Sequence, residues 1–244
     1  MIALATIWGV GCSGGEGGDA APQATSDLQT QSLRGAVVLP KDAPVFGKSI
    51  TRWTEEWWHW VSSVPGPNNP ELSLDPATCG VDQEGPVFFL PSYTKSSSFA
   101  RTCDVPLGKP VLLPTQVVLD SYPCPDPNFK PAPGQTLEDF LHQDVVGYND
   151  LYRNLAATLD AQSIDLMNHR HTTSLFTNTV DPSLLPLIPD PCLTGSPQPA
   201  VSDGWWLMLV LSPGPHDVHI SGVGPSGKTF VHDYQLHVRW DTHP

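Results

Sequence analysis

The chain has 244 residues, 39% of them hydrophobic and 15% charged, and its formal net charge is −13. This acidic balance, without any basic run, excludes a track for nucleic-acid phosphates, and we expect no nucleic-acid partner. The 20 glycines and 27 prolines favour many turns and short strands over long helices.

The amino-terminal part predicts an export signal followed by a tether. The apolar run "MIALATIWGV" and the sequence "GVGCSGG" around Cys12 are typical of a bacterial lipoprotein signal, in which the cysteine is lipidated. We expect a signal segment over 1–11, shortened because no Lys or Arg precedes the apolar run, and then the lipidated cysteine with a flexible tether over 12–34. A chance cysteine in a frayed terminus is the alternative. Residues 35–244 are expected to form a single β-sandwich domain.

The first half of this domain predicts one helix and three strands. Trp53 and Trp57 belong to an apolar series at helical spacing, which predicts a helix over 50–64 that Ser49 or Thr51 can cap. The sequence "SSVPGPNNP" ends the helix. Short apolar segments then predict strands over 85–91, 98–103 and 109–120.

The second half predicts a second helix and then mostly strands. Residues 136–155 begin with a Thr-x-x-Asp capping pattern and continue with helical apolar spacing. The elements expected after it are a hairpin over 157–166, a strand over 174–180, a Pro-rich loop over 181–199, and strands over 204–211, 216–222 and 229–240. Alternation in the last strand places one set of side chains on a shared face: Phe230, His232, Tyr234, Leu236, Val238 and Trp240.

These elements together predict a mainly all-β fold. About ten short strands separated by turn signals are typical of an antiparallel β-sandwich or a jelly-roll-like body, here with two peripheral helices.

Four cysteines besides Cys12 form an even set, which in an exported protein predicts two disulfides with three possible pairings. We favour Cys79–Cys103, which closes a loop around a predicted hairpin, and Cys124–Cys192, which ties a Pro-rich insertion to the body. No CxxC or His-x3-His pattern predicts structural zinc.

Four stretches taken together resemble a family of exported bacterial proteins that has no assigned biochemical function. They are "WTEEWWHW", "CGVDQEGPVFFL", "RTCDVPLGKPVLLP" and "DGWWLMLVLSPGPHDVHISG", in this order, and the resemblance covers about residues 49–240. It implies an all-β body and supports the Cys79–Cys103 pairing, and it carries over no catalytic residue. The segment "LLPTQVVLDSYPC" departs from the family, which tends to have an Asn and a large apolar residue there.

The segment Gly222–Thr229, "GVGPSGKT", matches the pattern of a phosphate-binding loop. Such a loop opens a helix, whereas here a two-residue alternation follows it. We therefore predict a turn between two antiparallel strands and no nucleotide.

Histidines on predicted strands are candidate zinc or copper ligands. His169 and His171 would point to one face of a strand, and His216 and His232 would be diagonal neighbours if their hairpin centres near Pro225. A histidine on a half-buried strand more often hydrogen-bonds a backbone carbonyl, and we expect no cofactor.

Eight tryptophans offer a second kind of candidate site. The helical stripe that contains Trp53 and Trp57 is expected to pack in the core. Trp58 lies at the edge of that stripe, and one of Trp205 and Trp206 is expected to face away from the core. Trp58 and the outward member of that pair are therefore candidates for a surface that stacks on a sugar ring or a partner's Pro-rich loop.

These features predict an exported envelope protein that touches the membrane through its lipid alone, in the periplasm or at the cell surface. The preferred function is non-enzymatic recognition of a glycan or a protein. The alternative is a metal-dependent extracellular enzyme that uses the strand histidines.

Overall fold

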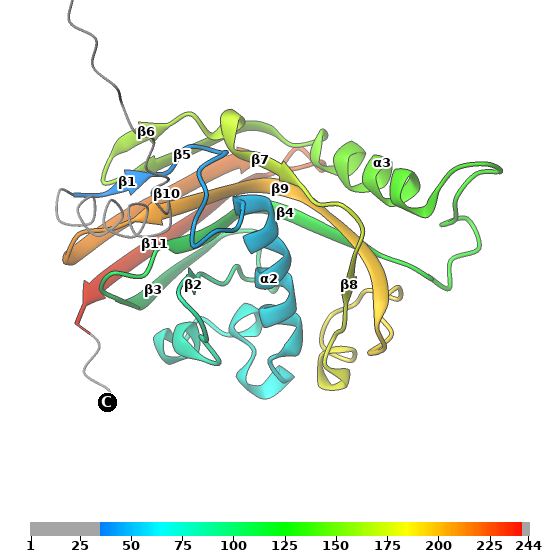
Figure 1. Cartoon of the computed structure of the whole chain (residues 1–244), viewed down its shortest axis with the longest axis horizontal. Helices are drawn as coiled ribbons and strands as arrows, with labels where there is room; N and C mark the ends of the chain where they lie inside the picture. Colours follow the sequence, from blue (N-terminus) through cyan, green and yellow to red (C-terminus); the bar gives the residue numbers. More distant parts are fainter. Residues whose placement is uncertain (1–34, 241–244) are drawn as a thin grey trace, which may run out of the picture.

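Two β-sheets and two helices make up the part of the chain that the computed structural model describes, residues 35–240 (Figure 1). The mainly β fold class is confirmed. The predicted signal segment, the lipidation site Cys12 and the tether lie outside the described residues, as do residues 241–244.

The first sheet is built on β9 (Gln198–Val210) and β4 (Val111–Ser121), which pair antiparallel over most of their length. β2 (Phe88–Phe89) pairs with the far side of β4. The other edge of β9 pairs in turn with three short strands, β8 (Phe176–Asn178), β7 (Arg170–Thr172) and β1 (Val37–Val38). β9 starts earlier than expected, inside the predicted Pro-rich loop, because its first residues have β8 as a partner.

The second sheet has the strand order β3-β11-β10-β5-β6. Its strands are β3 (Phe99–Pro106), β5 (Arg153–Leu159), β6 (Gln162–Ile164), β10 (Gly214–Val223) and β11 (Thr229–Arg239). β5 and β6 form the predicted hairpin. Its two turn residues, Asp160 and Ala161, have positive φ angles of 48° and 63°, the geometry that matches strand twist in a two-residue hairpin.

Two strand pairs correct the expectation of a purely antiparallel sandwich. β3 pairs parallel with β11, and β2 pairs parallel with β4. Only a tight hairpin forces neighbouring strands to run antiparallel. β3 reaches β11 from a distant part of the chain, so no such turn fixes its direction.

The main core lies between the two sheets. β11 buries Phe230, Tyr234, Leu236 and Val238 on the predicted face, whereas Trp240, beyond the strand end, is 75% exposed. From the first sheet, Val111, Leu113, Trp205, Leu207 and Leu209 pack into the same core.

Helix α2 (Ile50–Ser63) covers the opposite face of the first sheet, as Figure 1 shows where it crosses β9 and β4. Ser49, one of the two predicted caps, accepts a hydrogen bond from the Arg52 backbone N–H. The predicted tryptophan stripe packs against side chains of the first sheet that include Phe89, Leu112, Trp206, Met208 and Val210. The first sheet is therefore buried on both faces.

Helix α3 (Leu137–Asn149) is shorter than the predicted 136–155. Thr136 caps it, as the Thr-x-x-Asp pattern predicts, by accepting a hydrogen bond from the Asp139 backbone N–H. The rest of the predicted helix is drawn into β5, whose Arg153 pairs with Val223 of β10. Sheet pairing therefore outweighs the helical spacing of these residues.

Both predicted disulfides are confirmed, and they indicate an oxidising compartment. Cys79–Cys103 joins the turn at Pro76–Gly80 to β3, with a Cα–Cα distance of 5.7 Å. Cys124–Cys192 joins two loops that are 68 residues apart in the chain.

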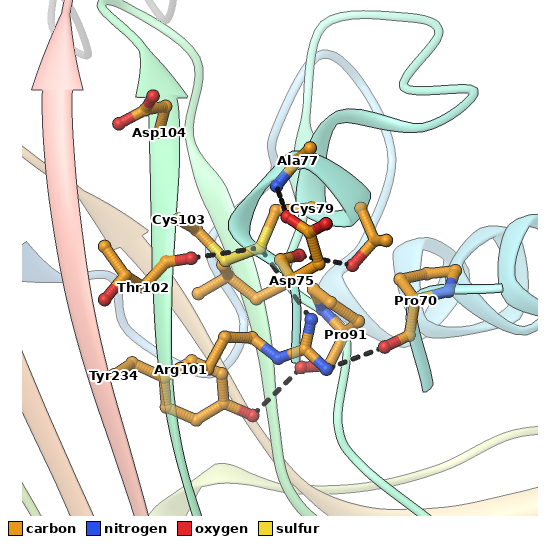
Figure 2. The surroundings of a disulfide bond; sticks show 12 residues. Pro70, Asp75, Ala77, Cys79, Pro91, Arg101, Thr102, Cys103, Asp104 and Tyr234 are labelled. Carbon is orange, nitrogen blue, oxygen red and sulfur yellow. Dashed lines mark hydrogen bonds between the residues drawn. A yellow bond between two sulfur atoms is a disulfide. The ribbon is translucent and has the colours of Figure 1, made fainter. Parts of the chain in front are cut away.

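A buried guanidinium lies beside the first disulfide (Figure 2). Arg101 is 2% exposed, and its Nη2 donates to the carbonyls of Pro70 at 2.6 Å, Ser73 at 2.7 Å and Ser92 at 3.0 Å. Tyr234 donates its hydroxyl to the carbonyl of Pro91 at 3.1 Å. These bonds fix the segment 70–92 against the second sheet.

Candidate functional site

One edge of β4 has no strand partner over most of its length. β2 pairs only with Val111 and Leu112, and the last contact on that side is the Leu90 backbone N–H, which donates to the Leu112 carbonyl at 2.9 Å. Beyond Leu112, no backbone hydrogen bond from residues 35–240 reaches this side of β4. An open edge presents a row of unpaired donors and acceptors.

The hydrogen bonds of β9 show which residues of β4 face the open side. The carbonyls of Met208 and Ser202 accept hydrogen bonds from segments on the far edge of β9, so the backbone N–H and C=O groups of these two residues point away from β4. Because the direction of the backbone N–H and C=O groups alternates along a strand, those of Trp205 and Asp203 point towards β4. These two residues pair with Gln116 and Val118.

It follows that the backbone N–H and C=O groups of Gln116 and Val118 form their hydrogen bonds with β9. Val117 and Leu119, between and after them, direct N–H and C=O groups to the open edge. The side chains of Val117 and Leu119 lie on the α2 face of the sheet, and those of Gln116 and Val118 on the α3 face.

Local sequence explains why the edge stays open. Pro114 has no N–H to donate, and the ladder shifts by one residue between Pro114 and Gln116. The chain after β2 also turns away, since the Thr94 N–H donates to the carbonyl of Glu71 at 3.0 Å. The segment 92–97 then forms a wall opposite the edge.

Two cavities lie along this edge, one on each face of the sheet, and share Ser92 and Val117. We call the pair the edge groove. The first, the aromatic cavity, has a volume of about 460 Å³ and meets four consecutive residues of β4, Pro114 to Val117. The second, the Trp58 cavity, has a volume of about 260 Å³ and meets Val117 to Leu119. Consecutive lining residues mean that both cavities reach the strand backbone.

The aromatic cavity contains a continuous series of rings. Neighbouring ring centroids are 5.8 Å apart for Tyr148 and Tyr152, 6.0 Å for Tyr152 and Phe230, and 4.9 Å for Phe230 and His232. Phe99, behind the cavity, stacks on His232 at 4.5 Å and continues the series to Tyr93 at 5.9 Å. Such rings offer flat apolar faces with polar tips to a ligand.

His232 is neutral at neutral pH, because burial lowers the pKa of its imidazole to about 4. Its Nδ1 is buried and has no hydrogen-bond partner among the described residues. Lys228 also lines the cavity, and no carboxylate among the described residues does. The chain as a whole has a net charge of −13, so a cavity lined by a lysine and by no described Asp or Glu differs from the overall acidic character of the sequence.

The predicted phosphate-loop match Gly222–Thr229 is the turn between β10 and β11, as expected. The Gly224 N–H donates to the Lys228 carbonyl at 2.9 Å, and Val223 pairs with Thr229. This turn forms one end of the aromatic cavity, a role that sequence reasoning did not assign to it.

Of the three candidate stacking tryptophans, the structure places one on the edge groove. Trp58 is half-buried, lines the Trp58 cavity, and donates its Nε1–H to Ser202 Oγ at 2.6 Å. Trp205 and Trp206 are 2% and 0% exposed. The expectation of an outward-facing member of this pair is wrong, because α2 covers the face of the sheet that was expected to be free.

The candidate metal ligands do not converge. His171 is buried in β7, with Nδ1 3.0 Å from Thr51 Oγ1, while His169 lies in a separate 3₁₀ turn. His216 contacts Asp160 at 2.7 Å and the Ser212 carbonyl at 2.9 Å, so both of its ring nitrogens are engaged.

The expected diagonal contact between His216 and His232 is also wrong. His216 pairs with Leu236, and His232 pairs with Ile220 four residues further along β10. Among residues 35–240, no group of three or more His, Cys, Asp or Glu side chains has an arrangement that could hold a metal ion.

A buried charge network positions α3 beside the aromatic cavity. Asp203 is fully buried and accepts from Arg170 Nη2 at 2.7 Å, Thr172 Oγ1 at 2.6 Å and Asn149 Nδ2 at 2.9 Å. Arg170 also donates to Asp150 at 2.6 Å. These bonds hold the carboxyl end of α3, which carries Tyr148.

Asp120, near the end of the open edge, predicts a pH-dependent stability. Burial, helped by a hydrogen bond to Asp144 and the charge of Asp190, raises the pKa of Asp120 to about 8. The unfolded chain releases this proton near pH 4 and the folded chain near pH 8, so this group's contribution to stability falls as pH rises across that window. We expect Asp120→Asn to be more stable than wild type at pH 8, by about 1–2 kcal/mol, since one pKa unit is worth about 1.4 kcal/mol before solvent screening.

Urea denaturation of both proteins at pH 5 and pH 8 checks this expectation. The advantage of Asp120→Asn should be larger at pH 8. An equal or smaller advantage at pH 8 would contradict the raised pKa.

Within residues 35–240, no helix is both long and apolar enough to cross a membrane. No protein-family model, curated protein or solved structure matches the chain.

Proposed function

We propose that this chain is an exported recognition module that binds an extended segment of a partner protein by strand addition at the open edge of β4. The observation that carries the proposal is the direction of the backbone groups of Val117 and Leu119. They point into a groove that no strand of the described chain fills. Main-chain hydrogen bonds give affinity in this mode of recognition, and alternate side chains give specificity.

The dimensions of the edge groove suit such a segment. Residues 114–119 line it, and six residues of strand extend over about 20 Å. Because side chains alternate along a strand, an added strand would send every second side chain to the aromatic cavity and the others to the Trp58 cavity. The two cavities lie on opposite faces of the sheet, as this alternation requires.

The two disulfides support export, since such bonds persist in oxidising compartments. In the proposal, a lipid on Cys12 attaches the chain to a membrane, and residues 13–34 allow the folded part to reach partners in the envelope. The family resemblance of the Trp and Cys motifs agrees with this location and remains a prediction.

A glycan is the second candidate ligand, because the series of rings through Tyr148, Tyr152 and Phe230 would stack on sugar rings. The metal-dependent enzyme is not supported, because the candidate histidines lie apart. The open backbone edge favours a peptide over a glycan, since a peptide backbone repeats its donors and acceptors at the spacing of the strand, whereas the hydroxyls of a sugar do not.

The test is selection of random peptides of about eight residues, displayed on phage, against the full-length chain. We expect binders whose affinity falls about tenfold or more when alternate peptide bonds are N-methylated, and changes little at the intervening positions. N-methylation removes a main-chain donor without changing the side chain, so the alternation reports strand addition directly.

A glycan array with the wild-type chain and Tyr148→Ala serves as the control arm. Sugar binding that is lost in Tyr148→Ala, with no peptide recovered, would establish the glycan and overturn strand addition. Peptides that bind without the alternating N-methyl effect would also overturn it.

A further inference from the structure

We infer that the Trp58 cavity accepts a basic side chain, an alkylammonium group such as that of lysine, from the bound segment. This inference rests on the proposed strand addition and adds the chemistry that one face of the groove selects. It follows from the charge and the shape of the cavity wall.

The charged residues of this wall are all acidic. Glu71 and Asp190 line the cavity, and among the described residues no Lys, Arg or His does. The negative charge of Asp190 also acts on Asp120, and it contributes to the raised pKa of that carboxyl group. A cation is the ligand charge that this arrangement complements.

Apolar side chains complete the wall and suit the stem of a lysine. Leu184, Ile188 and Leu193 come from the Pro-rich loop, Val180 lies just before it, and Trp58 comes from α2. A lysine buries its methylene stem along such a surface while its ammonium reaches a polar group. An indole ring adds a cation–π contact when an ammonium lies over its face.

Glu71 provides a buried acidic partner for the ammonium group. It is 8% exposed, and Ser92 donates its hydroxyl to Glu71 Oε1. Burial raises the pKa of Glu71, and the nearby Arg101 opposes this rise only in part. Arg101 donates to three carbonyls and does not line the cavity, so a bound ammonium would give Glu71 a direct cationic partner.

The aromatic cavity has the opposite character. Lys228 lines it, and no carboxylate of the described chain does. An added strand would therefore contact carboxyl groups on the α2 face of the sheet and the ammonium group of Lys228 on the other face. We expect a lysine preference at positions that face α2 and none at the intervening positions.

The test uses the peptides selected on the chain, synthesised with lysine, norleucine or glutamate at each position in turn. At the α2-facing positions, we expect lysine to bind about tenfold or more tightly than norleucine, and glutamate to bind more weakly than either. Norleucine keeps the stem and removes the charge, so the comparison isolates the ammonium group.

Two variants assign the effect to the cavity. Glu71→Gln and Asp190→Asn keep the acceptors for Ser92 and for the Cys192 N–H, and each should reduce the lysine preference about three- to tenfold. Glu84→Gln is the matched control, because Glu84 is exposed, lines neither cavity, and should leave the preference unchanged.

Equal binding of lysine and norleucine peptides, with the alternating N-methyl effect intact, would overturn this inference and leave strand addition standing. A lysine preference that both carboxyl variants leave unchanged would also overturn it, since the ammonium would then lie elsewhere. If no peptide shows the N-methyl alternation, strand addition fails, and this inference fails with it.

Discussion

Replacing Arg101 with methionine is expected to destabilise the folded chain by about 3–5 kcal/mol. The substitution keeps most of the apolar volume and removes the donor shared by the buried carbonyl of Pro70 and the part-buried carbonyls of Ser73 and Ser92. It also removes the positive charge nearest to buried Glu71. Each buried acceptor that loses its donor costs about 1–3 kcal/mol.

Urea denaturation of the oxidised proteins measures this loss, with Arg101→Lys as the matched variant. Lysine keeps the charge and one donor nitrogen, but it is shorter and cannot place a second nitrogen beside the disulfide sulfur, so we expect an intermediate loss of about 1–3 kcal/mol. A loss of less than 1 kcal/mol for both variants would show that the guanidinium is not the support of segment 70–92. Arg101→Lys remains informative even if Arg101→Met does not fold.

Replacing Trp57 with alanine is the second large expected effect, a loss of about 3–5 kcal/mol. Trp57 is fully buried, and its ring centroid lies 4.9 Å from that of Trp58 and 5.2 Å from that of Trp206. Its Nε1–H donates to the Leu90 carbonyl at 2.8 Å, next to the end of β2. The variant loses ring packing and leaves a buried carbonyl without its donor.

Trp57→Phe separates these two contributions. It keeps most of the ring and loses the donor, so we expect a loss of about 1–2 kcal/mol in urea denaturation. Equal losses for the alanine and phenylalanine variants would contradict a role for the ring in attaching α2 to the first sheet. If peptide binding is found, Trp57→Phe should also weaken it, because Leu90 precedes the wall of the groove.

Elements with a strong local signal were predictable from the sequence. Helix α2 has a cap at Ser49, a regular tryptophan spacing and a proline-rich end, and the structure places it within one residue of the prediction. The strands β10 and β11 also follow from alternation alone. In these segments local pattern and tertiary packing agree.

Features that depend on distant partners were not predictable. The sequence of β9 does not show that α2 covers its second face, so one of Trp205 and Trp206 was expected to face outward, whereas both are buried. Likewise, the sequence after α3 has helical apolar spacing, but in the structure Arg153 pairs with β10. In both cases the deciding contact comes from a segment far away in sequence.

The edge groove was also mostly unpredictable from local sequence. Its lining comes from segments near residues 58, 71, 92–97, 114–119, 148–152, 180–193 and 224–232, which no local pattern brings together. One signal was present in the sequence. Pro114 interrupts a segment that otherwise reads as a strand, and proline within a strand is typical of an open edge.

The position of β9 and β11 at the carboxyl end of the chain has a consequence for folding order. β9 joins the strands of the first sheet, and β11 pairs with β3 about 130 residues earlier in the chain, at positions such as Leu236 and Cys103. Neither sheet can assemble before β9 and β11 are available, and contacts of such high sequence separation form slowly. While the chain is being made, the strands that precede β9 would therefore lack the partners on which both sheets are built.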